Sequence, residues 1–181
     1  SKDIYGFKPQ NKIFLDKSSK KLCGKFRKGH FEGVLNVVNR FIEIIKPKYI
    51  YLGKKDYQQL FLIKKHIEKR KIKSRIIECE TIRENNGVAC SSRNSKLNKN
   101  QIEVASNIHN YLRNLKKKIR KNYNLFNINK IRIDLINLGA NKIDYIENYN
   151  IKSFKRILKS NKNFNLFFAY YIKNIRLIDN I

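Results

Sequence analysis

Methionine and tryptophan are absent from the 181-residue sequence, and proline occurs only twice. Because the sequence starts at Ser1, without an initiator methionine and within a continuing sequence pattern, we expect a fragment or a processed product. No apolar run approaches the roughly 20 residues that span a membrane, and no signal peptide is recognisable. The sequence therefore predicts no membrane association, and its length suits one or two domains with a real core.

Cysteine is scarce as well. The three cysteines, Cys23, Cys79 and Cys90, are odd in number and widely spaced. They fit neither a disulfide framework nor the paired spacing of a zinc site. We therefore expect no metal-ligating residues and a reducing, cytoplasmic setting.

Acidic residues are few: 14 Asp and Glu stand against 41 Lys and Arg, which gives a net charge of +27. One interpretation is a surface for nucleic acid. The other is a compositional bias toward Lys, Asn and Ile, and the scatter of lysines along the whole chain favours it. We expect no nucleic-acid partner, with a basic nucleic-acid-binding module kept as the alternative function.

The stretch from Tyr49 to Leu60 is the most informative part of what is present. Its pattern predicts a strand over Tyr49–Leu52, a turn over Gly53–Asp56 and an amphipathic helix beyond it. Ligands of open α/β sheets bind at the carboxyl ends of strands, and helix N-termini favour anions. Lys54 and Lys55 in this turn indicate either a phosphate site or a solvated loop, and the stretch alone leaves both open.

The flanking segments predict a parallel sheet. A helix that carries apolar residues from Val34 to Ile45 ends before Pro47, and Ser74–Thr81 reads as a second strand. Strand, helix and strand make a βαβ unit. Before these elements, we expect an irregular lead-in with a short strand at Lys12–Leu15.

The loop that follows this second strand carries a cluster of polar groups. Asn86-Gly87 is a turn signal, and Ser91, Ser92 and Arg93 place two hydroxyls beside a fork-shaped cation. Such a cluster can clamp an oligophosphate. A plain polar connector is the alternative.

The pattern changes from Asn100 onward to a small α+β unit. Asn100 and Glu103 resemble a capping box, and the basic stretch Lys116–Lys121 indicates the solvated end of that helix. A second helix is closed by Gly139. The expected strands cover Ile143–Asn148, Asn165–Ile172 and Ile175–Ile178, with a hairpin turn at Lys173-Asn174.

Three of these segments together resemble the pantothenate synthetase (pantoate–β-alanine ligase) family. Gly24–Val34 is similar to the family's Gly-x-x-Arg-Pro-Gly-His-Phe-x-Gly-Val, with Lys28 in place of proline. Gly53–Leu60 is similar to Gly-Glu/Lys-Lys-Asp-aromatic-Gln-Gln. Ile82–Asn94 is similar to Val-Arg-Glu-x-Asp-Gly-Leu-Ala-Leu/Met-Ser-Ser-Arg-Asn, with Asn86 and Cys90 as departures. The tail, with Ile143–Glu147 and Arg176–Asn180, agrees as well.

The resemblance implies the last two-thirds of an enzyme, because the family's ATP-binding His-x-Gly-His motif has no counterpart among the three histidines. It implies a fold in which residues 1–82 complete a Rossmann-like nucleotidyl-transferase domain with a parallel sheet. Residues 83–181 would form a small α+β lid domain with antiparallel strands.

The implied reaction joins pantoate and β-alanine into pantothenate, a coenzyme A precursor, at the expense of ATP through a pantoyl adenylate. A related adenylyltransferase that acts on another substrate is a further alternative, which Gln58-Gln59 disfavours. The expected co-reactant is ATP with its Mg²⁺, and a homodimer is expected.

The resemblance also assigns residues. The nucleotide would be lined by Gly53, Lys54, Lys55, Asp56, Ile82, Cys90, Ser91, Ser92 and Arg93. Lys55 would contact the phosphates, Asp56 the ribose and Gln59 the pantoate. Ser91, Ser92 and Arg93 would join Lys55 as catalytic groups by neutralising the β- and γ-phosphates. Gln59 lies four residues after Lys55, which predicts a shared helix face.

Overall fold

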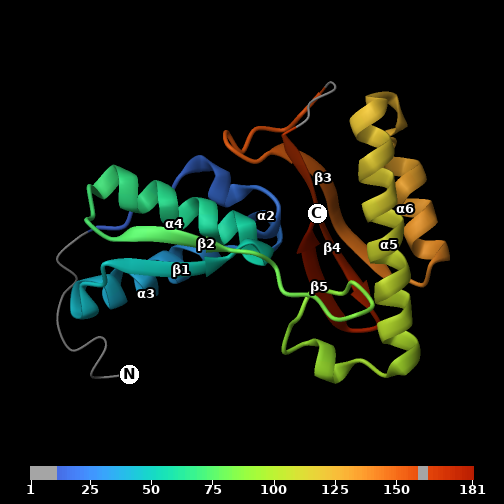
Figure 1. Ribbon diagram of the computed structural model, residues 1–181, viewed down its shortest axis with the longest axis horizontal. Helices are drawn as coiled ribbons and strands as arrows, with labels where there is room; N and C mark the ends of the chain where they lie inside the picture. The colour runs from blue at the N-terminus through green and yellow to red at the C-terminus, as the bar shows by residue number, and fades with distance from the viewer. Residues whose placement is uncertain (1–11, 159–162) are drawn as a thin grey trace. The chain divides into compact units, whose positions relative to one another are not determined.

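The computed structural model describes residues 12–158 and 163–181. The chain divides into two compact units, Ser1–Glu80 (unit 1) and Thr81–Ile181 (unit 2), and Figure 1 shows the elements of each. Within the described ranges, no helix combines the length and the apolar character that a membrane span requires.

Unit 1 is built around a two-stranded parallel sheet. Strand β1 (Tyr49–Gly53) pairs with β2 (Arg75–Cys79), and the register places Gly53 opposite Cys79. The remaining elements are η1 (Lys17–Lys20), α2 (Cys23–Phe26), α3 (His30–Ile45), η2 (Lys54–Asp56) and α4 (Tyr57–Arg70). The predicted βαβ unit with parallel strands is therefore confirmed.

The two long helices of unit 1 share a core with one face of this sheet. Leu35 and Ile42 of α3 pack with Ile63 and Ile67 of α4, and half-buried residues of both strands complete the cluster. Alternation along β1 sends Tyr51 to the other face, where it is 68% exposed. The apolar periodicity of the sequence thus selects the covered face.

The strand predicted at Lys12–Leu15 is wrong, because residues 12–16 are irregular. Their backbone groups bond to side chains of α4 instead of a neighbouring strand. The amide of Phe14 donates to His66 Nδ1 (3.0 Å), and the carbonyl of Ile13 accepts from Arg70 (3.2 Å). Four residues of β-prone pattern form a strand only where a ladder partner is available.

Unit 2 packs two helices against a three-stranded antiparallel sheet of order β3-β4-β5 (Figure 1). Its elements are η3 (Asn94–Lys96), α5 (Lys99–Lys121), η4 (Tyr123–Leu125), α6 (Ile128–Asn137), β3 (Lys142–Asn150), β4 (Phe164–Ile172) and β5 (Ile175–Asn180). This confirms the predicted antiparallel strands and their separation from the parallel sheet. Gly139, with φ of +105°, follows the end of α6 as predicted.

The capping box of α5 lies two residues earlier than predicted. Asn98, not Asn100, is the N-cap, and its side chain accepts from the amide of Gln101 (3.0 Å). Gln101 returns a hydrogen bond to the amide of Asn98 (2.9 Å). The prediction failed because Asn-x-x-Glu and Asn-x-x-Gln both fit a capping box, and both occur here within six residues.

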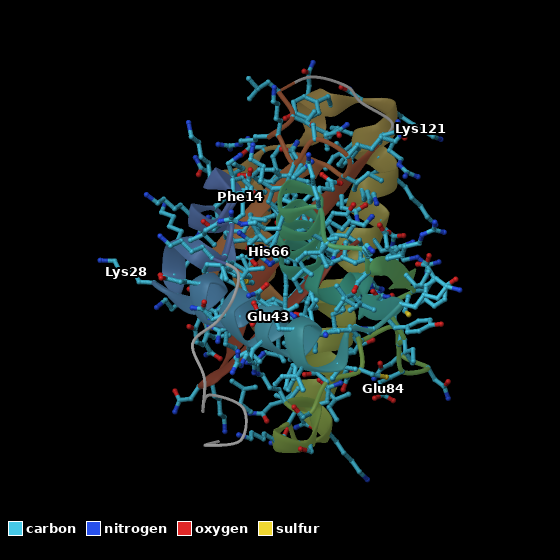
Figure 2. The ribbon with its side chains drawn as sticks, turned by 90° about the vertical axis from the view of Figure 1, so that its left-hand side faces the viewer. Phe14, Lys28, Glu43, His66, Glu84 and Lys121 are labelled. Carbon is cyan, nitrogen blue, oxygen red and sulfur yellow. The ribbon has the colours of Figure 1, made fainter. Side chains whose placement is uncertain are left out.

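The basic end of α5 is only partly solvated. Lys121 projects into solvent (Figure 2), but Lys116 lies against β4, where its amine donates to Asn165 Oδ1 (3.0 Å). That amine also lies 5.7 Å from the centre of the Phe164 ring. Burial and the charge of Arg120 lower the pKa of Lys116 to about 8. The prediction of a solvated stretch is therefore wrong for this residue.

Candidate active site

The turn at the carboxyl end of β1 separates its two lysines. Lys54 is held at the end of β2: its amine donates to Glu80 Oε1 (2.5 Å) and lies 4.0 Å from Glu78 Oε2. The hydrogen bond with Glu80 raises the pKa of Lys54. Lys54 therefore has carboxylates of the protein as its ionic partners.

Lys55 lies in a different environment from that of its neighbour. Its amine is 4.0 Å from Asp56 Oδ2, and its side chain is 18% exposed while that of Asp56 is 50% exposed. Lys55 precedes Asp56, the N-cap of α4, which makes no side-chain capping hydrogen bond. A cation beside an uncapped helix N-terminus adds to the positive end of the helix dipole. This end of the turn suits an anionic group such as a phosphate.

The two glutamines that follow have different roles. Gln58 is buried and structural: it accepts from the amide of Cys23 (3.1 Å) and donates to the carbonyls of Ser18 (2.9 Å) and Lys21 (2.7 Å). Gln59, the predicted substrate contact, is half-buried. Sequence reasoning missed Gln58, because nothing local distinguishes the two amides.

The face that Lys55 and Gln59 were expected to share was inferred from one continuous α-helix, and the structure interrupts that helix, so the shared face stays a prediction. Lys55 belongs to the 3₁₀ turn η2, and α4 begins only at Tyr57. A 3₁₀ turn advances about 120° per residue instead of about 100°, so the spacing of four does not by itself place the two on one α-helical face.

In unit 2, the predicted phosphate loop begins with a tight hairpin-like turn. Arg83 and Ala89 form an antiparallel bridge, and the amide of Cys90 donates to the carbonyl of Ile82 (2.9 Å). Gly87 adopts φ of +87° at the tip, which favours glycine. The side chain of Ile82 is 76% exposed, so it is free of the core of unit 2.

The cluster that follows is compact and faces solvent. Ser91 is half-buried, whereas Cys90, Ser92 and Arg93 are exposed. The amide of Arg93 donates to Ser91 Oγ (3.2 Å), and the Cys90 thiol lies 3.5 Å from Glu84 Oε1. These contacts hold two hydroxyls and a guanidinium on one short turn, as a phosphate-binding group requires.

Asn94 forms hydrogen bonds to the backbone of this turn. Its Nδ2 donates to the carbonyl of Ala89 (3.1 Å), and its amide donates to the carbonyl of Ser91 (3.0 Å). In the described part of the chain its buried Oδ1 has no hydrogen-bond partner. A buried acceptor without a partner is costly, so a donor supplied from outside the protein would stabilise this conformation.

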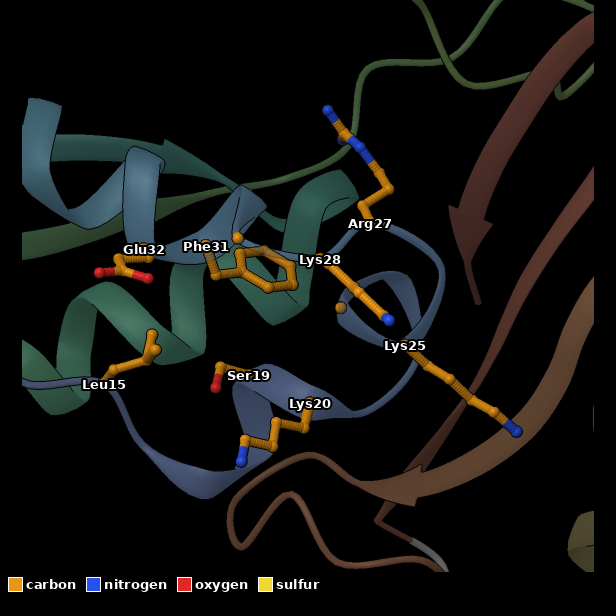
Figure 3. A pocket seen from close by; sticks show the side chains of 10 residues that line it. Leu15, Ser19, Lys20, Lys25, Arg27, Lys28, Phe31 and Glu32 are labelled. Atoms are coloured by element: carbon orange, nitrogen blue, oxygen red, sulfur yellow. The ribbon is translucent and has the colours of Figure 1, made fainter.

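The segment Gly24–Val34, which resembles the first family motif, borders a separate cavity in unit 1. A cavity of about 420 Å³ is lined by Leu15, Ser19, Lys20, Gly24, Lys25, Arg27, Lys28, Gly29, Phe31 and Glu32 (Figure 3). The side chains of Lys25 and Arg27 extend in different directions, and Arg27 Nη1 lies 2.8 Å from His30 Nε2. The predicted site residues are not among those that line this cavity.

The structure brings the predicted residues together in two groups, one in each unit. Gly53, Lys54, Lys55 and Asp56 share the turn after β1, and Cys90, Ser91, Ser92 and Arg93 share the loop before η3. Over the described residues, no three His, Cys, Asp or Glu side chains gather in a way that could hold a metal ion. The lysines of the first group, and the hydroxyls and guanidinium of the second, can stabilise negative charge and form hydrogen bonds.

Comparison with known proteins identifies the family that shares these features. A curated pantothenate synthetase from Flavobacterium psychrophilum is 35% identical over 99% of this chain, which spans 64% of that relative. A pantoate-beta-alanine ligase from Francisella tularensis, crystallised with beta-gamma ATP and beta-alanine, is 35% identical with a TM-score of 0.75. It matches 99% of this chain, which spans 61% of it.

A pantothenate synthetase from Thermus thermophilus has the same fold, with a TM-score of 0.86 at 22% identity over 99% of this chain and 66% of its own. The family model described as pantoate-beta-alanine ligase matches residues 1–181. The chain spans less than two thirds of the length of the Flavobacterium and Francisella relatives. It belongs to the pantoate-beta-alanine ligase family.

Proposed function

We propose that this chain carries nucleotide and pantoate contacts of an ATP-dependent pantoate–β-alanine ligase that forms AMP. The observation that carries the proposal is the placement of Lys55 at the uncapped start of α4, while Lys54 is held by Glu80. Family membership over residues 1–181 supports it, and so does the Francisella relative crystallised with beta-gamma ATP and beta-alanine.

The reaction has two steps. The carboxylate of pantoate attacks the α-phosphate of ATP, which gives pantoyl adenylate and releases pyrophosphate. The amine of β-alanine then attacks the acyl carbon, which gives pantothenate and releases AMP. Both steps need reactants held in position and negative charge stabilised, and the polar groups of this chain can supply both.

Within unit 1, Gly53, Lys54, Lys55 and Asp56 line the nucleotide, with Lys55 on the phosphates and Asp56 near the ribose. Gln59 holds pantoate. The half-buried position of Gln59 and the uncapped start of α4 support these roles.

Within unit 2, Cys90, Ser91, Ser92 and Arg93 neutralise the β- and γ-phosphates, and the backbone of Ile82 meets the adenine. The exposure of Cys90, Ser92 and Arg93 on one ordered turn supports these roles. Lys55, Ser91, Ser92 and Arg93 are the catalytic groups of the proposal.

The proposal extends to the enzyme's setting. Mg²⁺ accompanies ATP through its phosphates, and carboxylates of the chain do not enclose it. Residues 1–82 complete a Rossmann-like catalytic domain, and residues 83–181 form its α+β lid domain. The enzyme works in the cytoplasm as a homodimer.

Family membership does not favour the alternative of a basic nucleic-acid-binding module. A filter-binding assay with single- and double-stranded DNA at physiological salt tests it directly. Retention that weakens steeply with salt and resists competition by ATP would favour that alternative.

The test of the proposed activity uses two proteins. The first is the chain alone. The second is a fusion in which the Francisella segment that precedes the matched region is placed before Ser1. AMP production by the fusion should require both pantoate and β-alanine, and the chain alone should turn over far more slowly. ATP hydrolysis that ignores both substrates would contradict the proposal.

Gln59→Ala in the fusion separates substrate binding from chemistry. Because a contact with bound pantoate is lost in the ground state and the transition state alike, the KM for pantoate should rise while kcat changes little. Gln58→Ala is the contrasting variant: it removes three hydrogen bonds to the 18–23 segment and should lower stability. A large fall in kcat with unchanged KM for Gln59→Ala would overturn its assignment to pantoate.

A further inference from the structure

The hairpin-like turn over residues 82–90 is fastened to the antiparallel sheet by one arginine. Arg83 Nη1 donates to Asp179 Oδ2 (2.6 Å) and Nη2 donates to Asp179 Oδ1 (3.2 Å), so the guanidinium and the carboxylate meet fork to fork. The same guanidinium donates to the carbonyl of Gly87 (3.1 Å) and to that of Asn180 (3.3 Å). One side chain thus joins the tip of the turn to β5, which lies 96 residues further along the chain.

A histidine from α5 supports the same turn. The ring of His109 is buried, and its Nδ1 lies 3.7 Å from Asp179 Oδ2 and 3.4 Å from Arg83 Nη1. A Cβ atom added to Gly87 would lie 2.7 Å from His109 Cδ2, so the backbone of the turn rests directly on the ring. Ser106 Oγ, also on α5, donates to the carbonyl of Asn86 (2.8 Å).

The ionic contact is shielded from solvent. The Arg83 and Asp179 side chains are 25% and 10% exposed. Burial alone would raise the pKa of Asp179, but the nearby His109 ring and the hydrogen bonds and charge of Arg83 hold it below its ordinary value. The carboxylate is therefore ionised at neutral pH, and a bidentate pair in this setting fixes orientation as well as distance.

We propose that Arg83 and Asp179 are positioning residues, which orient the 82–90 turn so that the Ser91–Arg93 cluster is presented to a phosphate-bearing ligand. The identification of that ligand as ATP rests on the proposed function; the ordering of the loop does not. Neither residue needs to touch the ligand, because Arg83 is already engaged by Asp179 and two carbonyl oxygens. Cys90 follows Ala89 of the bridge directly, so a displaced turn moves the cluster with it.

The test compares two carboxylate-to-amide variants of the full chain. Asp179→Asn keeps the shape of the side chain and removes the charge that holds Arg83. Asp144→Asn is the matched control, because Asp144 accepts a 2.7 Å hydrogen bond from Arg176 Nε in the same sheet, with both side chains similarly buried. Both variants disrupt an arginine–aspartate pair, and only the first pair holds the 82–90 turn.

The first measurement is amide hydrogen exchange of the loop. The amides of Glu84, Gly87 and Cys90 donate to carbonyls within the turn. In Asp179→Asn their exchange should accelerate by about tenfold or more, while amides of β4 stay protected. In Asp144→Asn the loop should exchange as in the unaltered chain. Unchanged loop exchange in Asp179→Asn, or equal acceleration in both variants, would overturn the proposal.

The second measurement is ATP affinity by equilibrium titration, which a purely structural role would not change selectively. Asp179→Asn should weaken ATP binding by about tenfold, and Asp144→Asn should leave it unchanged even where its melting temperature falls. This titration uses the fusion enzyme. If the fusion without a further substitution does not bind ATP, the proposed function fails, and hydrogen exchange still decides whether the pair orders the loop.

A second variant covers the case in which Asp179→Asn does not fold. Arg83→Lys keeps the positive charge but loses the fork that spans the carboxylate and the carbonyl of Gly87. Its loop amides should exchange between the rates of the unaltered chain and of a fully released loop, with β4 unaffected. Native-like exchange of the loop in Arg83→Lys would show that geometry is unimportant and would refute the positioning role.

Discussion

The helices of the two units begin in different ways. In unit 1, α3 starts after Gly29 and α4 after Asp56, and neither residue makes a side-chain capping hydrogen bond. In unit 2, α5 starts with the reciprocal bonds of Asn98 and Gln101, and Asn127 caps α6 through the amide of Lys130. Because amides in the first turn lack partners within the helix, this difference decides which helix starts remain open to a ligand. Side chains therefore cap α5 and α6 of unit 2, whereas α3 and α4 of unit 1 begin without a side-chain cap.

The buried polar groups of the two units differ as well. In unit 1, His66 Nδ1 accepts from the amide of Phe14 (3.0 Å), so this nitrogen carries no proton, the ring is neutral, and its Nε2 faces Asn39 Oδ1 (3.0 Å; Figure 2 labels His66 and Phe14). In unit 2, the central group is the ionised carboxylate of Asp179. His66 and His109, the histidines of these two networks, are both buried.

The largest effect should come from the open helix start of unit 1. Lys55→Ala in the fusion enzyme should lower kcat by about a hundredfold, because negative charge grows on the departing pyrophosphate in the transition state. Lys54→Ala should be mild, because its amine already pairs with Glu80 and Glu78. Steady-state kinetics of the two variants decide the matter, and equal losses would mean that the lysines form one diffuse electrostatic patch.

A smaller effect is expected where the turn of unit 2 rests on His109. Gly87→Ala should destabilise unit 2 by about 2 kcal/mol or more, because φ of +87° and the 2.7 Å approach to His109 both exclude a Cβ atom. Gly33→Ala in α3 is the control: with nothing within 4 Å of an added Cβ, it should stabilise unit 1 by about 0.5–1 kcal/mol. Urea titrations with probes resolved for each unit measure both, and a neutral Gly87→Ala would contradict the described packing.

The contributions of His66 in unit 1 and of Asp179 in unit 2 to stability should be lost over different pH ranges. Burial lowers the pKa of His66 from 6.5, and the charge of Arg70 adds to the effect. The unfolded chain therefore takes up its proton first on acidification, so the contribution of His66 is complete above pH 6.5 and is lost as the pH falls below it. The pKa of Asp179 is lowered from 3.8, so its contribution is lost only below that value.

Between pH 7 and pH 5, unit 1 should therefore lose stability while unit 2 does not, by at most about 1.4 kcal/mol per pH unit for a single group. Lys116 of unit 2 titrates at about 8, above this range. The measurement is unit-resolved urea unfolding at several pH values. His66→Gln should flatten the slope of unit 1; a slope that survives in His66→Gln would assign it to another group.

Local patterns in the sequence predicted the elements, and long-range contacts explain what they missed. The strand, turn and helix from Tyr49 onward are confirmed, because alternation and helical periodicity are properties of neighbouring residues. The irregular backbone around Phe14 depends on His66, which is 52 residues away, and the order of the 82–90 turn depends on Asp179. No local pattern contains such pairings.

The candidate site divides in the same way. The residue types in the Gly53–Asp56 turn predicted a cluster of cationic groups after a strand, and the structure places them there. Their different partners could not be predicted, because Glu80 and Glu78 reach Lys54 only through the pairing of β1 with β2. Assignment of Lys55 to the phosphates therefore stays a prediction for the kinetic test.

The smallest effect tests the closed helix start of unit 2. Asn98→Ala removes the acceptor for the Gln101 amide and leaves α5 to begin as α4 does, so unit 2 should lose about 1 kcal/mol. Asn100→Ala, in the exposed first turn, removes no cap and should change stability by less than about 0.5 kcal/mol. Unit-resolved urea unfolding distinguishes the two. If Asn100→Ala were the more destabilising variant, Asn100 and not Asn98 would be the N-cap of α5. The described difference between the helix starts of the two units would then be wrong for α5.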